Sequence, residues 1–208
     1  MHLAAACRYP ANPAMLASLV AAVTVAATAS ATIAGPTVLP QAAAAPCAPA
    51  PTVETANRLN PAEPEVKLPV PKGWHRVRNL DSKDVRLAVA KPAQRGTFAP
   101  NAVVTVGRAG KSNALRTVIS DEVAAVRPIA TAEPSISRGT TCGFPSAVVS
   151  YTAAARGSDP ARPAKALVVA VPRGADAYAV VVTLQTTDAS DPSFQRATAT
   201  VIRGIQID

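Results

Sequence analysis

The stretch Ala166–Leu184, ALVVAVPRGADAYAVVVTL, contains two apolar runs that are separated by a short polar link. The runs Ala166–Val171 and Tyr178–Leu184 are rich in valine, whose branched side chain favours β-strands. The link Pro172–Asp176 contains a proline and a glycine, which are typical of a hairpin connection. We therefore predict two antiparallel strands here, and hairpin-length links favour an antiparallel sheet for the domain.

Outward from this hairpin, further segments have the composition of strands. Residues 85–90, 101–106 and 147–152 are apolar or alternate between two faces, and each is expected to form a strand. Residues 64–71 alternate as well, but their prolines restrict them to an edge strand or a strand start. Trp74, the single tryptophan, is expected to anchor the core.

Two segments have the period of an amphipathic helix. Residues 115–126 place their apolar side chains on one face, and Ser112 or Asn113 is expected to cap the start. A second helix is predicted to begin at Asp191 as its N-cap and to end at Gly204 as its C-terminal cap. The order of strands, helix, strands and helix predicts an α+β domain, an antiparallel sheet with helices packed on its faces.

Three parts of the chain differ in composition. Residues 1–34 have a short start with Arg8, an apolar run and a cleavage pattern of small residues, which predicts a signal peptide. The apolar run is shorter than the roughly 20 residues that a membrane span needs. Residues 35–63 are a leader rich in proline and alanine and are expected to be disordered. Residues 64–208 are predicted to form the single folded domain.

Composition limits the core and the partners. The chain is 49% apolar and only 3% aromatic, so the core must consist of aliphatic side chains. Its formal net charge is +8, and no long run of like charges occurs. An exported protein meets little nucleic acid, so we expect no nucleic-acid partner. An anionic envelope surface or lipid headgroup fits the charge better.

The three cysteines allow two interpretations. Cys7 would leave with the signal peptide, and Cys47 and Cys142 would remain in an oxidising compartment, where a disulfide is the usual fate. Alternatively, Cys142 is buried and Cys47 is free or lipidated. Pro46 directly before Cys47 is a poor match to a lipoprotein cleavage site. We therefore expect a secreted or envelope-associated protein that is either unanchored or lipid-anchored.

No motif predicts catalysis, a metal or a cofactor. The stretch Thr105–Ser112 ends like a phosphate-binding loop but has threonine where the first glycine is required. A hydrolase would have to use His75, the single histidine after the signal, with Ser146, which lacks the usual flanking glycines. We therefore expect a protein that is not an enzyme, and keep a hydrolase as a third hypothesis.

Several segments together resemble a known family. They are Leu68–Trp74, Ala99–Val106, Gly143–Val149, Gly174–Tyr178 and Val201–Gln206. In their order and spacing they are similar to the mycobacterial LpqN/LpqT lipoprotein family, which includes proline-rich secreted antigens. The resemblance covers about residues 64–207 and implies a PsbP-like α/β/α sandwich. It carries no catalytic residue, and a good lipidation motif is missing here.

The resemblance implies a non-enzymatic role in the cell envelope. The expected ligand is an amphipathic lipid or glycolipid, and the expected partners are the extracytoplasmic domain of an MmpL-type transporter or a host protein. The alternative is a secreted antigen-like protein that docks on host or cell-wall partners through its basic surface. Side chains beside the predicted turns are the candidates for ligand binding: Phe98, Arg108, Arg138, Phe144 and Tyr151.

Overall fold

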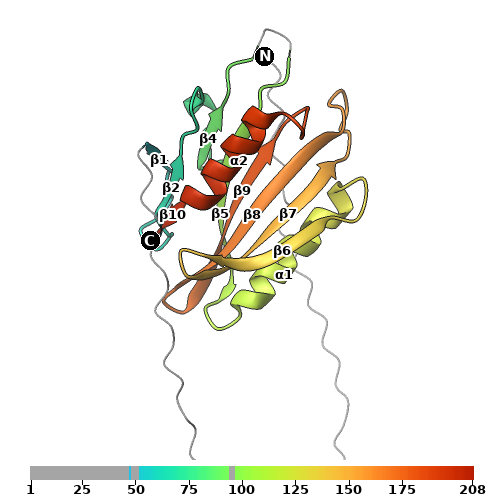
Figure 1. The fold of residues 1–208 in the computed structure, drawn as a ribbon. Helices are drawn as coiled ribbons and strands as arrows, with labels where there is room; N and C mark the ends of the chain where they lie inside the picture. The colour runs from blue at the N-terminus through green and yellow to red at the C-terminus, as the bar shows by residue number, and fades with distance from the viewer. Residues whose placement is uncertain (1–46, 48–51, 94–96) are drawn as a thin grey trace, which may run out of the picture.

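The computed structural model describes Cys47, residues 52–93 and residues 97–208. The predicted signal peptide and most of the predicted leader lie outside these residues. The described part contains a large sheet, a small sheet and two long helices (Figure 1). In chain order the small sheet and the first strands are β1 (Val53–Thr55), β2 (Val66–Pro69), β3 (His75–Arg76) and β4 (Leu87–Ala90). A short 3-10 turn, η1 (Arg78–Leu80), lies between β3 and β4.

The rest of the chain supplies most of the large sheet and both helices. The elements are β5 (Asn101–Lys111), α1 (Leu115–Val126), η2 (Arg127–Ile129), β6 (Ser135–Thr141), β7 (Phe144–Ala153), β8 (Arg162–Arg173), β9 (Asp176–Gln185), α2 (Pro192–Gly204) and β10 (Gln206–Ile207). The large sheet has seven strands in the order β3-β4-β5-β9-β8-β7-β6, and every pairing is antiparallel.

Each face of the large sheet is covered by one helix. Figure 1 shows α2 across one face, with the small sheet β1-β2-β10 at its side, and α1 behind the opposite face. Successive side chains of a strand point to opposite faces. On β8, Leu167 and Val169 pack beneath α2, whereas Ala166, Val168 and Ala170 pack beneath α1. The predicted antiparallel sheet with helices on both faces is therefore confirmed.

The predicted central hairpin is β8–β9, and its loop has two residues. Arg173 pairs with Asp176, and Gly174 has a φ of +57° at the first loop position. A II′ turn requires a positive φ at that position, and glycine adopts it without steric cost. Its neighbour Ala175 keeps an ordinary negative φ. This local chemistry explains why the sequence pattern found the hairpin.

The helix starts differ from each other. Asp191 caps α2 as predicted, because its Oδ1 accepts a hydrogen bond from the main-chain N–H of Ser193 at 2.8 Å. The cap of α1 is Ala114, which has no side-chain hydrogen bond, so the prediction of Ser112 or Asn113 is wrong. Gly204 is the last helical residue and has no positive φ. The C-cap position belongs to Ile205, where the chain turns directly into β10.

The folded domain begins earlier than the composition predicts. Residues 52–63 were assigned to the leader, but β1 pairs with β2 and Ala56 is 5% exposed in the core beneath α2. Glu63 is also buried, and its two carboxylate oxygens each accept a hydrogen bond at 3.0 Å from the guanidinium of Arg86. The boundary at residue 64 is therefore too late, because the partners that order this segment come later in the chain.

Strand β6 was not predicted. β6, SISRGTT, is polar and exposed along most of its length, so it lacks the apolar alternation of a half-buried strand. It forms because β7 provides a complete antiparallel partner from Ser135–Ser150 to Thr141–Phe144. Within the described residues, no helix is long and apolar enough to cross a membrane.

Candidate functional site

The β6–β7 hairpin and the end of α2 enclose a hollow. We call it the hairpin groove, and its volume is about 400 Å³. Its lining consists of Cys47, Ser137, Arg138, Gly139, Thr140, Thr141, Cys142, Gly143, Ser146, Val148, Leu167, Ile202, Arg203 and Ile205. This volume lies within the range of small-molecule sites in proteins.

The turn at the tip of the hairpin fixes which atoms face the groove. Cys142 and Gly143 form the two-residue loop between the paired residues Thr141 and Phe144, with φ values of +51° and +78°. Two positive φ values indicate a type I′ turn. In such a hairpin the closing pair exchanges both main-chain hydrogen bonds, and the pattern then alternates along the strands.

This alternation leaves half of the main-chain groups of β6 without a partner strand. The N–H and C=O groups of Ile136, Arg138 and Thr140 point away from β7. β6 is the last strand of the large sheet, and no described strand lies on its outer side. The groove is therefore bordered by donors and acceptors that a ligand can use.

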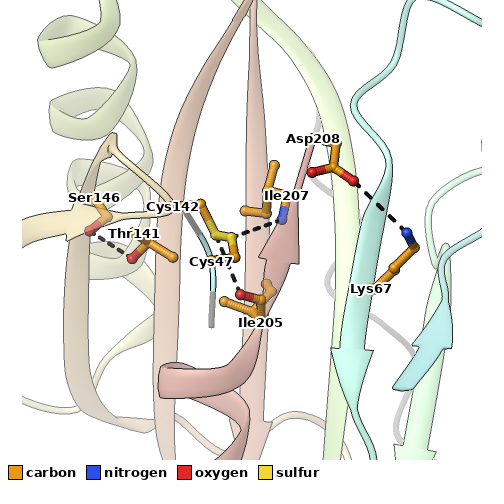
Figure 2. The surroundings of a disulfide bond; sticks show 8 residues. All are labelled: Cys47, Lys67, Thr141, Cys142, Ser146, Ile205, Ile207 and Asp208. Atoms are coloured by element: carbon orange, nitrogen blue, oxygen red, sulfur yellow. Dashed lines mark hydrogen bonds and ion pairs between the residues drawn. A yellow bond between two sulfur atoms is a disulfide. The ribbon is translucent and has the colours of Figure 1, made fainter. Parts of the chain in front are cut away.

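One wall of the groove carries hydroxyl groups. Ser137, Thr141 and Ser146 lie on the α2 face of the hairpin and contribute to the lining. Oγ1 of Thr141 donates a hydrogen bond to Oγ of Ser146 at 3.0 Å (Figure 2). Gly139 faces the groove as well, because it pairs with Ser146 across the hairpin. A Cβ atom added to Gly139 would meet nothing within 4 Å. The hydroxyl wall therefore borders open space.

The opposite side of the groove is aliphatic. Leu167 and Ile205 are each 1% exposed and belong to the core beneath α2. Val148 and Ile202 are partly buried and pack against the same core. Arg203, on the exposed side of α2, supplies a positive charge at the rim. The groove thus combines an apolar floor, a hydroxyl wall and a cation.

A disulfide between Cys47 and Cys142 closes one end of the groove. The Cα atoms of the two residues are 4.6 Å apart. Figure 2 shows the bond beside β10, where Sγ of Cys47 accepts a hydrogen bond from the main-chain N–H of Ile207 at 3.3 Å. Sγ of Cys142 lies 3.4 Å from the carbonyl oxygen of Ile205. The bond joins the segment before β1, the hairpin turn and the C-terminal strand.

The predicted ligand residues do not come together at one site. Arg138 lines the groove, but it shares a strand face with Ile136, which packs beneath α1, so its side chain belongs to that face. Phe144 directly follows the hairpin turn and packs against the core beneath α2. Tyr151 packs against the cluster beneath α1.

The other two candidates lie farther away. Phe98 precedes β5 at the end of the sheet opposite the hairpin turn, and the guanidinium of Arg162 stacks 4.1 Å from the centre of its ring. Arg108 forms an exposed ion pair of 2.7 Å with Asp176. Its hydrogen bond to Asp176 is the main reason that the pKa of this carboxyl is lowered. A role of these five residues in ligand binding stays a prediction.

The catalytic pair and the phosphate loop considered from the sequence do not form in the described part of the chain. His75 lies on β3 and Ser146 on β7, and four strands separate them, so a hydrolytic pair of these two is excluded. The stretch Thr105–Ser112 is not a phosphate loop, because β5 continues through it to Lys111 and pairs with β9. No group of three or more metal-ligating side chains occurs in the described part of the chain.

Sequence reasoning missed most of the groove. Ser137, Thr140 and Thr141 lie on the polar strand that was not predicted, and Ile202 and Arg203 come from a helix far along the chain. One signal was available: Cys142-Gly143 lies between Thr141 and Phe144, and a residue followed by glycine between two strand-forming residues resembles a two-residue hairpin loop. Nothing in the sequence indicates that α2 ends beside this loop.

Comparison with known proteins places the chain in a family. The model of the family described as "Probable lipoprotein LpqN" matches residues 52–208. The crystal structure of LpqN, a protein involved in cell envelope biogenesis of Mycobacterium tuberculosis, superposes with a TM-score of 0.60 at 15% identity. That match covers 75% of this chain and 90% of LpqN.

A crystal structure from Bacteroides thetaiotaomicron matches with a TM-score of 0.41 at 11% identity, over 69% of this chain and 45% of that one. No curated protein sequence matches the chain. The LpqN superposition shows that the two proteins share a fold. The family match begins at Thr52, directly before β1, and so includes the segment that the composition had assigned to the leader. The chain belongs to the family of the probable lipoprotein LpqN.

Proposed function

We propose that the protein binds an amphipathic glycolipid in the hairpin groove, as a non-enzymatic component of the extracytoplasmic cell envelope. The observation that carries the proposal is the division of the groove into an aliphatic floor and a hydroxyl wall within about 400 Å³. A ligand with an apolar chain and a hydroxyl-rich head matches both parts. The family membership of the protein and the role of LpqN in the cell envelope of M. tuberculosis support the proposed location in the cell envelope.

The polar side of the groove fits a sugar better than a simple anion. Its side-chain hydroxyls and the outward main-chain groups of β6 both donate and accept hydrogen bonds, as sugar hydroxyls do. Arg203 is the single charged side chain that α2 contributes to the lining. A free fatty acid would leave most of the hydroxyl wall unused.

The apolar side of the groove accommodates a short length of acyl chain. Val148, Leu167, Ile202 and Ile205 come from β7, β8 and the end of α2 and form a continuous aliphatic floor. Each buried methylene contributes about 0.8 kcal/mol, so a few methylene groups give a measurable gain over the sugar alone. We therefore expect the monoester to bind and its separate head to bind weakly.

A titration with a trehalose monoester of one acyl chain tests this proposal, with free trehalose and a free fatty acid as controls. Gly139→Leu fills the groove without a clash, since open space surrounds the position of the new Cβ atom. Gly107→Leu is the matched control, because Gly107 is also a strand glycine with open space and does not line the groove. Calorimetry should show binding that Gly139→Leu lowers at least tenfold and Gly107→Leu leaves unchanged.

Two results would count against the proposal. Equal affinity in both leucine variants would mean that the ligand binds elsewhere. Binding that disappears at moderate salt would favour docking through the basic surface, since screening weakens exposed charge interactions and leaves apolar contacts intact. The β6–β7 hairpin contributes Arg138 to that surface, and Arg156 lies in the loop that follows β7. No acidic residue occurs between Glu133 and Asp159.

The protein partners expected from the resemblance stay predictions. An MmpL-type transporter domain and a host protein are both compatible with an exposed basic hairpin, and the geometry of the groove does not distinguish them. A transporter partner that receives the ligand would have to contact the rim of the groove. Gly139→Leu would then lower ligand transfer without lowering the affinity between the two proteins.

A further inference from the structure

The family to which the chain belongs is described as a lipoprotein family, so the acylated cysteine has to be identified. Lipoprotein acylation joins a diacylglyceryl group to the thiol of a cysteine that follows the apolar run of the signal. Of the three cysteines in the sequence, Cys7 precedes that run and Cys142 lies inside a folded hairpin. By position, Cys47 is the candidate for acylation.

The structure uses the sulfur of Cys47 for a different bond. Cys47 is joined to Cys142, and a sulfur attached to its own Cβ can form one further covalent bond. A thioether to a lipid and a disulfide at this atom therefore exclude each other. We infer that Cys47 is a cross-linking cysteine and not the acylation site that the family description suggests.

The conformation of Cys142 supports this assignment independently. The first position of a type I′ turn has a positive φ and favours asparagine, aspartate or glycine. Cys142 is the one described non-glycine residue with a positive φ, at +51°. A cysteine at this position is unfavourable for the backbone, so its presence is explained by what the sulfur does.

The surroundings also fit a cross-link. The turn at Cys142 and strand β10 lie far apart in the sequence, and the bond holds Cys47 against both. The two cysteines are 95 positions apart in the sequence, and the segment between them includes β1, β2, β4, β5 and α1. Closing so long a loop removes much conformational freedom from the unfolded chain. The bond therefore stabilises the layer beneath α2 and one end of the hairpin groove.

The chemistry requires an oxidant. The two thiols lose two protons and two electrons, and an S–S bond forms between Cys47 and Cys142. A thiol oxidoreductase of the extracytoplasmic space accepts the two electrons and two protons, and its own disulfide is thereby reduced to two thiols. The cross-linked chain is then two hydrogens lighter than the reduced chain and carries no acyl group on Cys47.

The test uses the full chain with its own leader, expressed in a mycobacterium. Intact mass spectrometry and labelling with a maleimide, before and after reduction, report the state of each sulfur. We expect no label before reduction, labels on Cys47 and Cys142 afterwards, and no acyl mass. An acylated chain that begins at Cys47, or free thiols at both positions in the exported protein, would overturn the inference.

Two single variants and their double variant separate a cross-link from an anchor. If the two sulfurs are bonded, Cys47→Ser and Cys142→Ser should lower Tm equally, on the order of ten degrees. The double variant should lower Tm no further, because either substitution already removes the whole bond. Neither variant should change the partition of the protein between membrane and medium.

The opposite pattern would identify an anchor. If Cys47→Ser alone moves the protein from the membrane into the medium, and Cys142→Ser has no effect on location, Cys47 is acylated and the inference fails. The result does not depend on the glycolipid titration, since the groove can bind a ligand in an anchored or an unanchored protein.

Discussion

The two faces of the large sheet are packed in different ways. Beneath α1 the strands present small side chains, with Ala147, Ala166, Ala170, Ala177 and Ala179 forming much of the contact. Beneath α2 they present larger residues, among them Leu167, Leu184, Tyr178 and several valines. The α1 face is covered mainly by one helix, whereas the α2 face also receives the small sheet, the N-terminal segment and the disulfide.

This difference explains where a ligand site can form. A helix that rests on alanines approaches the strands closely and leaves little space between side chains. Larger side chains hold α2 farther from the sheet, so the edge near β6 and β7 is filled by several separate segments. The hairpin groove lies where these segments do not fill the space completely. The hairpin groove therefore belongs to the layer beneath α2, which is built from several separate segments, and not to the layer beneath α1, which is built mainly from one helix.

The largest expected effect concerns the N-terminal segment that joins the α2 layer. Glu63→Ala would leave the buried guanidinium of Arg86 without its carboxylate, and we expect a loss of about 3–5 kcal/mol in the free energy of unfolding. Urea unfolding measures it. Glu63→Leu combined with Arg86→Met should be less harmful than Glu63→Ala, because no unpaired charge remains. Equal losses would mean that the segment is held by other contacts.

The second prediction exchanges the packing of the two faces. Leu167→Ala should create a cavity beneath α2 and cost about 2–5 kcal/mol, since Leu167 is fully buried. Ala170→Leu, three residues along the same strand, should overfill the contact with α1 and cost about 1–3 kcal/mol. Denaturant unfolding of both variants tests whether the faces differ as described. A neutral Ala170→Leu would show that the α1 face has spare room.

The third prediction concerns the starts of the helices. Asp191→Ala should lower Tm by roughly 2–4 degrees, because α2 loses the acceptor for the N–H of Ser193. Ala114→Ser at the start of α1 should raise Tm by a similar or smaller amount, since that cap has no side-chain hydrogen bond. Calorimetry detects both shifts. If Ala114→Ser lowers Tm, the backbone at that position does not suit a side-chain cap.

The smallest expected effect is a difference in pH dependence between the two helices. The hydrogen bond from the Ser193 side chain is the main cause of a lowered pKa at Asp191. Burial is the main cause of a raised pKa at Glu122 on α1, and Asp121 adds to it. The Asp191 contribution to stability is present at neutral pH and is lost as pH falls through its lowered pKa. Ionised Glu122 destabilises the folded protein, and this destabilisation is lost as pH falls through the raised pKa of Glu122.

Substituting each carboxylate by its amide separates the contribution of Glu122 to stability from that of Asp191. Glu122→Gln should therefore stabilise the protein at neutral pH and have no effect below the ordinary pKa of glutamate. Asp191→Asn should destabilise it slightly at neutral pH, and this loss should vanish in strong acid. Free energies of unfolding, measured from neutral pH to strong acid, show whether each substitution stabilises or destabilises the protein. A stabilising effect of Glu122→Gln that persists in acid would mean that packing, and not charge, is responsible.

The sequence predicted those elements whose signals are local. The valine-rich runs of β8 and β9 and the Pro-Arg-Gly link identify a hairpin without any knowledge of the rest of the chain. The Asp191-Pro192 start of α2 is equally local. The family resemblance then predicted the sandwich of helices and sheet, and the superposition on LpqN agrees.

The candidate site was predictable only in fragments. Arg138 and Phe144 were singled out because they lie beside turns, and they do lie at or beside the groove. Phe98, Arg108 and Tyr151 were chosen by the same rule but lie elsewhere. Position beside a turn cannot distinguish the ends or the faces of a sheet, because strand order depends on pairings between distant segments.

The sequence by itself determined the strand-rich α+β class, the central hairpin and the cap of α2, since each depends on neighbouring residues. The tertiary structure alone decided that residues 52–63 fold, that polar β6 becomes a strand, and that α2 ends beside the β6–β7 turn. These features depend on partners such as Arg86 for Glu63 and β7 for β6. A chain reveals such partners only when it is folded, because hydrogen bonds and burial between distant segments leave no periodic pattern in the sequence.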